Sequence, residues 1–357
     1  MVCRPNSRSL SVFQGKGLTL TAAKASRVME AAEAFHAERV ERPLELASYD
    51  ELCRTQNVVD VSALPRLINS RFRPDARMLW IEGFDLLQRL NVWIPYELVH
   101  VDFTEPGAAG AGCFVQSSNG LASGNDVLEA INHAICEVIE RDAMTLWSRM
   151  NPRVQFTRRL DLMTVDDPDC QWVIEMFERA GVRIGVWDMT SDVGVAVYFC
   201  NVIERDDDPL RRLYSASGYG CHPFREIALL RALTEAAQSR LAAIAGARDD
   251  LTRSVYKRQR DAAFLRHQRS SIDNHAPARK FNEAPTWKAD TFDDDIVWQL
   301  GRLESVGIRH VIVVNLVKAE FGIPVVRVCI PGLECAAMNP DSYMLGIRGR
   351  EFAQGQA

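Results

Sequence analysis

The chain has 357 residues, of which 47% are hydrophobic and 25% are charged, a composition typical of a globular protein with a large core. Its net charge of −5 argues against a general nucleic-acid-binding protein, and no apolar run approaches the roughly 18 residues of a membrane span. The opening MVCRPNSRSL lacks the apolar segment of a signal peptide, and the nine cysteines include no C-x-x-C pair. These features predict a cytoplasmic protein with reduced thiols and no nucleic-acid or membrane partner.

Helical and strand-like patterns alternate along the chain. Helices are predicted at 21–38, 126–150, 224–244 and 292–306. Strands are predicted at 78–81, 92–94, 97–103, 113–117, 182–187, 195–202, 213–218, 311–317 and 325–330. The charged segment 250–290 predicts an irregular surface excursion. No Pro/Gly/Ser-rich linker interrupts the pattern, so we expect one α/β domain with a mixed sheet over residues 1–357.

A glycine turn followed by an alanine-rich helix occurs twice, and a related helix occurs a third time. The copies are GKGLTLTAAKASRVMEAAE at 15–33, SNGLASGNDVLEAINHAICEVIER at 118–141 and ALLRALTEAAQSR at 228–240. Each carries a pair of oxygen ligands three residues apart: Glu30 and Glu33, Glu137 and Glu140, and Glu235 and Gln238. Residues at i and i+3 share one helix face. If these faces converge, they form the hard oxygen environment that Mg²⁺ needs when it arrives with nucleotide phosphates.

The alternative is that each acidic pair belongs to a solvated helix face, as most E-x-x-E pairs do. The neighbours in the first two copies argue against it, because they are small or apolar on most sides of the helix. They are Ala22, Ala23, Ala25, Val28, Ala31 and Ala32 in the first copy, and Ala130, Ile131, Ala134, Ile135, Val138 and Ile139 in the second. A helix apolar on most faces is buried, and buried carboxylates need partners. We therefore expect the first four glutamates to share one site and to have raised pKa values without metal.

The string SNGLASGN followed by EA and E-x-x-ERDA closely resembles the YcaO family of ATP-dependent enzymes that modify peptide backbones. The GKG…S-x-x-x-E-x-x-E and RALTEAAQSRL…GARDDL segments match the family in the same order, and the resemblance spans nearly the whole chain. The segments RPNS…FQGKG and ARDDL resemble the corresponding segments of family members that are encoded beside TfuA-type proteins. The resemblance implies a YcaO-like fold with ATP and Mg²⁺ as cofactors.

Carried over by position, the resemblance implies metal ligands and nucleotide-binding residues in all three copies. The implied metal ligands are Glu30, Glu33, Glu137 and Glu140. The implied nucleotide-binding residues are Ser26, Asn125, Glu129, Arg141, Arg231, Glu235, Gln238 and Arg240. Arginine suits phosphate because its guanidinium is planar and always protonated. His133 stands where the family often has Gln, and it is either a pocket-lining variant or a core histidine.

Both ends depart from the family pattern. Relatives usually carry a strand-forming segment before RPNS, and Val2-Cys3 continues an apolar pattern there, so we expect further chain upstream. Azoline-forming relatives often end in a Pro-x-Pro-x-Pro tail, whereas this chain ends GIRGREFAQGQA. Thioamide-forming members commonly lack that tail, and its absence favours thioamide chemistry.

The resemblance implies that a nucleophile attacks a peptide amide, and that ATP phosphorylates the resulting oxygen, which leaves as phosphate. A sulfide donor gives a thioamide, and a neighbouring Cys, Ser or Thr of the peptide gives an azoline. We expect a peptide or protein substrate, a TfuA-like partner and a possible homodimer.

The alternatives are an azoline-forming cyclodehydratase, an inactive partner-binding scaffold and a plain metal-binding protein. No general base is evident. His222 is a weak candidate, and Cys113, Cys221 and Cys335 are either lone nucleophiles or small buried hydrophobes.

Overall fold

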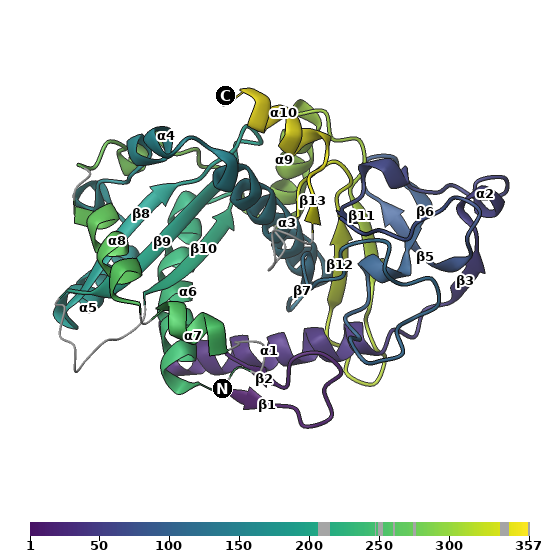
Figure 1. Cartoon of the computed structure of the whole chain (residues 1–357), viewed down its shortest axis with the longest axis horizontal. Coiled ribbons are helices and arrows are strands. Elements are labelled where there is room, and N and C mark those ends of the chain that lie inside the picture. The colour runs from purple at the N-terminus through teal and green to yellow at the C-terminus, as the bar shows by residue number, and fades with distance from the viewer. Residues whose placement is uncertain are drawn as a thin grey trace. The chain divides into compact units, whose positions relative to one another are not determined.

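A computed structural model describes residues 1–205, 215–246, 248, 253–259, 261–273, 276–335 and 343–355. The chain forms two compact units. The first unit comprises Met1–Asn6, Leu10–Glu30 and Met150–Lys288, and the second comprises Ser7–Ser9, Ala31–Arg149 and Ala289–Ala357. Helix α1 (Leu20–Glu38) contributes residues to both (Figure 1). Each described helix is too short or too polar to span a lipid bilayer.

The first unit is built on an antiparallel three-stranded sheet of β8 (Val182–Asp188), β9 (Ala196–Glu204) and β10 (Ala216–His222), in the order β10-β9-β8 (Figure 1). Helices α5 (Pro168–Arg179) and α6 (Arg225–Ala245) pack on one face. The alternating pattern of the strands explains this arrangement, because their apolar residues gather on the face that α5 and α6 cover.

The opposite face of this sheet carries an aromatic row, Trp187, Phe199 and Tyr219, with ring centroids 5.3 and 5.2 Å apart. Helix α8 (Ala262–Asp273) packs on β8 and β9, where Gln268 Oε1 accepts a hydrogen bond from Asn201 Nδ2 at 2.6 Å. The first unit also contains a two-stranded sheet of β1 (Val2–Cys3) and β2 (Val12–Phe13).

Two glycines allow helix α6 to lie directly against strand β10. A Cβ atom at Gly218 would lie 2.2 Å from Ala232 O, and one at Gly220 would lie 2.1 Å from Ala228 O. No side chain fits at such distances, so the G-x-G pattern of this strand serves backbone packing. The close approach brings Glu235 of α6 to the strand, where its Oε1 accepts the Tyr219 amide at 3.2 Å.

The second unit contains an antiparallel sheet in the order β3-β5-β11-β12-β7, with β6 paired to the other side of β5. Its strands are β3 (Leu44–Ala47), β5 (Met78–Asp85), β6 (Leu90–Pro95), β7 (Leu121–Ser123), β11 (Ile312–Asn315) and β12 (Val325–Cys329). A core that includes Trp80, Ile94 and Phe114, each fully buried, supports it. Pairings between named strands are all antiparallel, and the parallel pairings described are the isolated bridges Val58–Trp93 and Leu160–Arg279.

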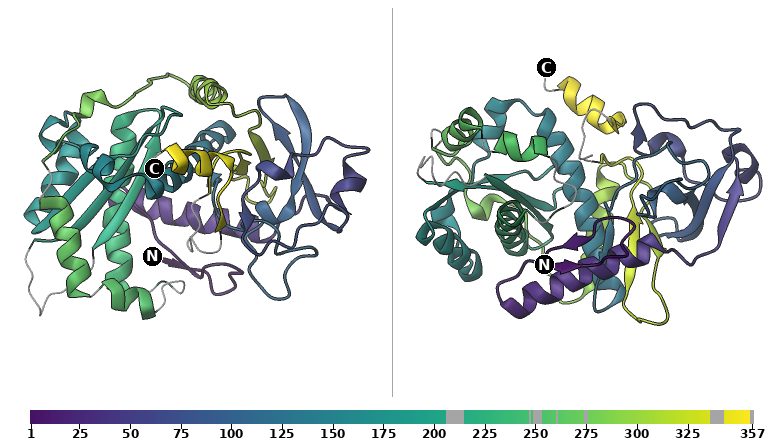
Figure 2. Two further views of the ribbon diagram at one scale, coloured as in Figure 1. Left: turned by 45° about the horizontal axis from the view of Figure 1, so that its top comes forward. Right: turned by 60° about the horizontal axis from the view of Figure 1, so that its bottom comes forward.

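Helix α3 (Val127–Arg149) packs on β12 and β7, and α9 (Phe292–Ser305) and α10 (Ile347–Gly355) pack on α3 (Figure 2). The remaining elements are short. They are α2 (Tyr49–Leu52), α4 (Pro152–Thr157), α7 (Arg253–Gln259), β4 (Arg66–Leu67), β13 (Tyr343–Met344) and four 3₁₀ turns at Val61–Ala63, Tyr96–Leu98, Leu162–Thr164 and Phe281–Glu283.

All four predicted helices are present within two residues of their expected ends, and most predicted strands are confirmed. Two strand predictions were wrong: 97–103 begins in a 3₁₀ turn and continues as a loop, and 113–117 forms only an isolated bridge at Phe114. Residues 213 and 214 of a third lie outside the described part. The irregular segment predicted at 250–290 in fact contains α7 and α8.

Burial of the repeated helices differs from expectation in the first copy. In α3 the six apolar neighbours named above are all buried. In α1 the N-terminal half is largely exposed, with Ala22 and Ala25 exposed and Val28 52% exposed. The expectation of a helix buried on most faces therefore holds for α3 and was wrong for the first half of α1.

The α6–β10 contact yields a stability prediction. Gly218→Ala should lower the free energy of unfolding by about 1–3 kcal/mol, because its new methyl group overpacks a backbone contact. Gly301→Ala is the matched control, since Gly301 is an exposed residue of helix α9 with open space at its Cβ position. That control should raise the free energy by about 0.5–1 kcal/mol. Urea unfolding measures both; equal effects of the two substitutions would contradict the packing argument.

Candidate functional site

The GKG loop lies against the start of helix α1. A Cβ atom at Gly15 would lie 2.1 Å from Ala23 O, so only glycine permits this approach. The Lys16 amide donates to Ser26 Oγ at 3.3 Å, and Lys16 Nζ lies 2.5 Å from Glu235 Oε2 of helix α6. The sequence predicted Ser26 and Glu235 at the nucleotide, and the structure joins them through a lysine that it had not singled out.

Glu30 is the carboxylate with the clearest electrostatic perturbation. Burial raises its pKa to about 7, although the positive charge of Lys16 and a hydrogen bond from Gln238 oppose the rise. Gln238 Nε2 lies 3.5 Å from Glu30 Oε1 and donates more strongly to Gln14 O, at 2.7 Å. The negative charge of Glu235 adds to the rise. The positive charge of Arg248 opposes the rise as well, but burial outweighs all of these effects.

The two arginines predicted on α6 differ in their surroundings. Arg240 forms an ion pair with Glu204 of β9. Arg231 lies beside β10, where its charge adds to the burial that lowers the pKa of His222 to about 3. The Nδ1 atom of His222 accepts the Phe224 amide at 3.0 Å, next to the first residue of α6. This ring is thus neutral and engaged at the start of the helix.

In the second unit, Glu33 and Glu129 each receive two hydrogen bonds around the β7–α3 turn. Glu33 Oε1 accepts the Ser123 amide at 2.9 Å and its hydroxyl at 2.6 Å. Glu129 Oε2 accepts the Asn125 amide at 2.7 Å and its side-chain Nδ2 at 3.0 Å. The LASGN segment thus positions carboxylates of both α1 and α3.

Glu137, Glu140 and Arg141 form a compact charged group on helix α3. Arg141 Nη2 lies 3.5 Å from Glu137 Oε1, and Nη1 lies 3.7 Å from Glu140 Oε1. Glu140 is buried, with 3% of its surface exposed. These distances are longer than a good charge-assisted hydrogen bond, so the arginine offsets the two negative charges without binding either tightly.

The donor set fits Mg²⁺ with a nucleotide, because carboxylate oxygens are the protein ligands that Mg²⁺ prefers and Lys16 and Arg141 can meet phosphate. Within the described residues, no three His, Cys, Asp or Glu side chains already form a metal-binding group. The predicted carboxylates instead form hydrogen bonds or ion pairs with other side chains and amides of the protein. Their assignment as metal and nucleotide ligands stays a prediction.

A second set of charged contacts, which sequence reasoning missed, anchors the C-terminal helix on α3. Asp142 accepts two hydrogen bonds from Arg348 Nε, at 2.9 and 3.1 Å, and one from Nη2 at 3.0 Å. Glu334 accepts the Gly349 amide at 2.6 Å and the Gly346 amide at 3.0 Å, and Tyr343 Oη also donates to it. Asp142 directly follows Arg141 in the ERDA string, and nothing in the sequence indicated its contact with Arg348.

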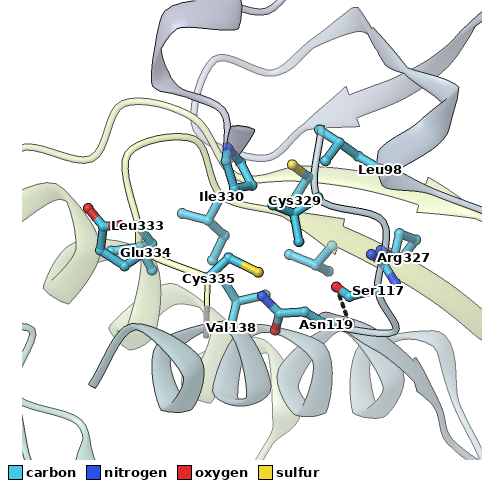
Figure 3. A pocket seen from close by; sticks show the side chains of 13 residues that line it. Leu98, Ser117, Asn119, Val138, Arg327, Cys329, Ile330, Leu333, Glu334 and Cys335 are labelled. Carbon is cyan, nitrogen blue, oxygen red and sulfur yellow. Dashed lines mark hydrogen bonds between the residues drawn. The ribbon is translucent and has the colours of Figure 1, made fainter. Parts of the chain in front are cut away.

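The remaining sequence candidates are buried or half-buried. All nine cysteines are free thiols. Cys113 and Cys221 are buried, and Cys113 donates to Gly110 O at 3.2 Å. His133 lies half-buried on α3. Cys335 differs, because it lines a cavity of about 40 Å³ in the second unit together with Arg327, Ser117 and Asn119 (Figure 3).

Comparisons with known proteins identify the family of the chain. A family model described as the ATP- and Mg²⁺-binding YcaO cyclodehydratase matches residues 14–334. The chain is therefore an ATP- and Mg²⁺-binding enzyme, and it belongs to the YcaO family, as the motifs predicted.

Relatives and solved structures show how far the similarity extends. An uncharacterized protein in the tfuA 3′ region of Rhizobium leguminosarum bv. trifolii is 36% identical over 362 residues, covering 99% of this chain and 83% of that protein. A YcaO from Methanopyrus kandleri bound with AMPPCP and Mg²⁺ has a TM-score of 0.67 at 24% identity over 90% of this chain and 78% of its own. A heterocyclase in complex with substrate and cofactor has a TM-score of 0.74 at 21% identity, with 90% of this chain and 44% of that chain covered. The two solved structures show the shared fold.

The raised pKa of Glu30 predicts a pH dependence. Protonated Glu30 stabilises the fold below its unfolded pKa near 4.5, and that stability is lost as the pH rises through about 7. Because Mg²⁺ needs the ionised form, Mg-ATP affinity should fall by up to tenfold between pH 8 and pH 6.

Calorimetric titration at pH 6, 7 and 8 measures that affinity for the wild type and for Glu30→Gln. Protonation of ATP is common to both proteins, so the difference between their pH profiles reports Glu30. Parallel profiles would contradict the assignment.

Glu137→Gln tests the carboxylates of α3. At a hundredfold excess over Kd, Mg-ATP should stabilise the wild type by about 2.7 kcal/mol and raise its Tm. The substitution should abolish that rise and leave the ligand-free fold intact. Glu175→Gln is the matched control, because Glu175 also pairs with an arginine four residues on but lies exposed on α5. A variant Glu137→Gln that keeps the full rise in Tm would show that Glu137 is not a ligand, and a variant that unfolds would mark Glu137 as a structural residue.

Proposed function

We propose that the chain activates a peptide backbone amide by ATP-dependent phosphorylation and replaces its oxygen by sulfur, giving a thioamide. The observation that carries the proposal is the pairing of Lys16 with Glu235 and of Arg141 with Glu137 and Glu140, which places cationic groups beside the oxygen donors of the motifs. The likeness to a protein in the tfuA 3′ region supports a sulfur-delivering TfuA-like partner.

The chemistry balances in atoms and charge with hydrosulfide as the nucleophile. Its sulfur bonds to the amide carbon, the amide oxygen takes the γ-phosphoryl group of ATP, and the carbon–oxygen bond then breaks. Phosphate leaves with the proton of hydrosulfide, and the products are a thioamide, ADP and phosphate. Positioning and charge neutralisation supply most of the rate in such phosphoryl transfers.

The chain's own residues divide this work. We assign Glu30, Glu33, Glu137 and Glu140 to Mg²⁺, which when bound supplies charge neutralisation at the phosphates. Lys16 and Arg141 would exchange their carboxylate partners for phosphate oxygens. The other predicted nucleotide-binding residues are Ser26, Asn125, Glu129, Arg231, Glu235, Gln238 and Arg240. Among them, Arg240 needs to leave Glu204 before it can meet phosphate.

Azoline formation is the second candidate, because the family model carries the description cyclodehydratase and a heterocyclase shares the fold. Here a Cys, Ser or Thr of the peptide replaces hydrosulfide, and the peptide loses one water. The activation step and the residues that perform it are the same.

Mass spectrometry separates the two reactions. The protein, ATP, Mg²⁺, sulfide and a candidate peptide are incubated with and without a TfuA-like protein. We expect the peptide to gain the mass difference between sulfur and oxygen, in an ATP- and sulfide-dependent manner. Glu140→Gln should lose this activity, whereas Glu178→Gln, an exposed acid on α5, should keep it. Loss of one water without added sulfide would instead establish azoline formation.

A further inference from the structure

Both polar and apolar side chains line the cavity in the second unit. Arg327 of β12, with Ser117 and Asn119 from the loop before β7, lies near Cys335, and Leu98 and Val138 contribute apolar surface (Figure 3). The volume is about 40 Å³, or roughly three times what a single water needs. This size suits a ligand of one to three atoms and excludes a nucleotide or a peptide segment.

Arg327 is a buried cation with an unused donor. Only 3% of its surface is exposed, and its Nη1 atom has no hydrogen-bond partner among the residues that the structure describes. A guanidinium stays protonated in proteins, and a buried charge that lacks a partner costs free energy. The geometry therefore leaves a positive group beside a cavity that a small anion fits.

The nearby acidic groups do not supply that anion. Glu334 lines the same cavity, but its oxygens accept the Gly346 and Gly349 amides and the Tyr343 hydroxyl. Burial raises the pKa of the Cys335 thiol, so this group remains protonated near neutral pH. Glu137 acts on Arg327 electrostatically, but it is also engaged by Arg141.

The surroundings of Cys335 show that this cavity accommodates sulfur. The side chains of Asn119 and Ser117 line the same cavity as Cys335, and both act to lower the pKa of its thiol, against the burial that raises it. A second sulfur atom here would meet an amide, a hydroxyl and the guanidinium of Arg327. Glu137, which we assign to Mg²⁺, is close enough to Arg327 for its negative charge to raise the pKa of that guanidinium.

We propose that this cavity binds the small anion that serves as nucleophile, hydrosulfide, and holds it beside the guanidinium of Arg327. The identity of the anion rests on the proposed function, whereas the existence of an anion site rests on the cavity and the buried guanidinium alone. Binding is non-covalent, and Ser117, Asn119 and Arg327 are its donors.

Bromide is the probe for the site, because its anomalous scattering locates it in crystals. Crystals of the full chain soaked in sodium bromide should show an anomalous peak in this cavity. The peak should vanish in Arg327→Met, which keeps an unbranched side chain as far as the position of Nε and removes the charged guanidinium. Arg66→Met is the matched control, since Arg66 is a partly buried arginine of the same unit that does not line the cavity, and it should keep the peak.

Competition identifies the ligand without any peptide substrate. Sodium hydrosulfide added at the bromide concentration should reduce the peak at least twofold, and sodium acetate should not. A wild-type crystal without a bromide peak would overturn the site, and a peak that hydrosulfide leaves unchanged would overturn the assignment to sulfide.

If Arg327→Met fails to fold, Ser117→Ala should weaken the peak in its place, and an unweakened peak would count against the proposal. Bromide displacement together with no thioamide product would count against the proposed function and leave the anion site standing.

Discussion

A glutamate that leaves water must find a cation, a proton or hydrogen-bond donors, and this requirement governs helices α1, α3 and α6. Each predicted carboxylate meets it differently. Glu235 pairs with Lys16, Glu33 takes both donors of Ser123, and Arg141 stands between the two acids of α3. At Glu30 burial outweighs the charges of Lys16 and Arg248 and the hydrogen bond from Gln238, so the pKa of this carboxyl is raised to about 7.

On our assignment, one set of residues would serve the protein with and without its nucleotide. A bound divalent cation would supply the positive charge that Lys16 and Arg141 now provide to the carboxylates. Lys16 and Arg141 would then be available to phosphate, and the local charge would stay nearly balanced. Rigid elements support the exchange: glycines press α6 onto β10, and Asp142 ties α3 to Arg348 of the C-terminal helix.

The sequence predicted the helices and the family because both depend on short-range patterns. The glycine turns and the i, i+3 acidic pairs are local, and the long helices follow from 3.6-residue periodicity. The strand predictions at 97–103 and 113–117 failed because of one contact between them. Buried Glu97 accepts the amides of Gly112, Cys113 and Phe114, at 2.6 to 3.0 Å, and so fixes these segments as loops. Helix α8 was missed because its buried residues are few, Leu265 and Ile272 among mostly polar neighbours.

The site residues that the sequence did not predict owe their roles to contacts with residues far away along the chain. Lys16 and Glu235 are 219 positions apart, and Asp142 and Arg348 are 206 apart. A single sequence carries no periodic signal for such pairs. The same holds for Arg327, which looks like one more strand residue until its burial beside a cavity is seen.

The most direct test of the central claim is a crystal structure with Mn²⁺ in place of Mg²⁺ and a non-hydrolysable ATP analogue. The account predicts an anomalous Mn²⁺ peak at ligand distances of about 2.0–2.3 Å from glutamate oxygens of both α1 and α3, drawn from Glu30, Glu33, Glu137 and Glu140. Lys16 and Arg141 should then contact phosphate rather than carboxylate. Metal and nucleotide bound without any of these four glutamates would contradict the account.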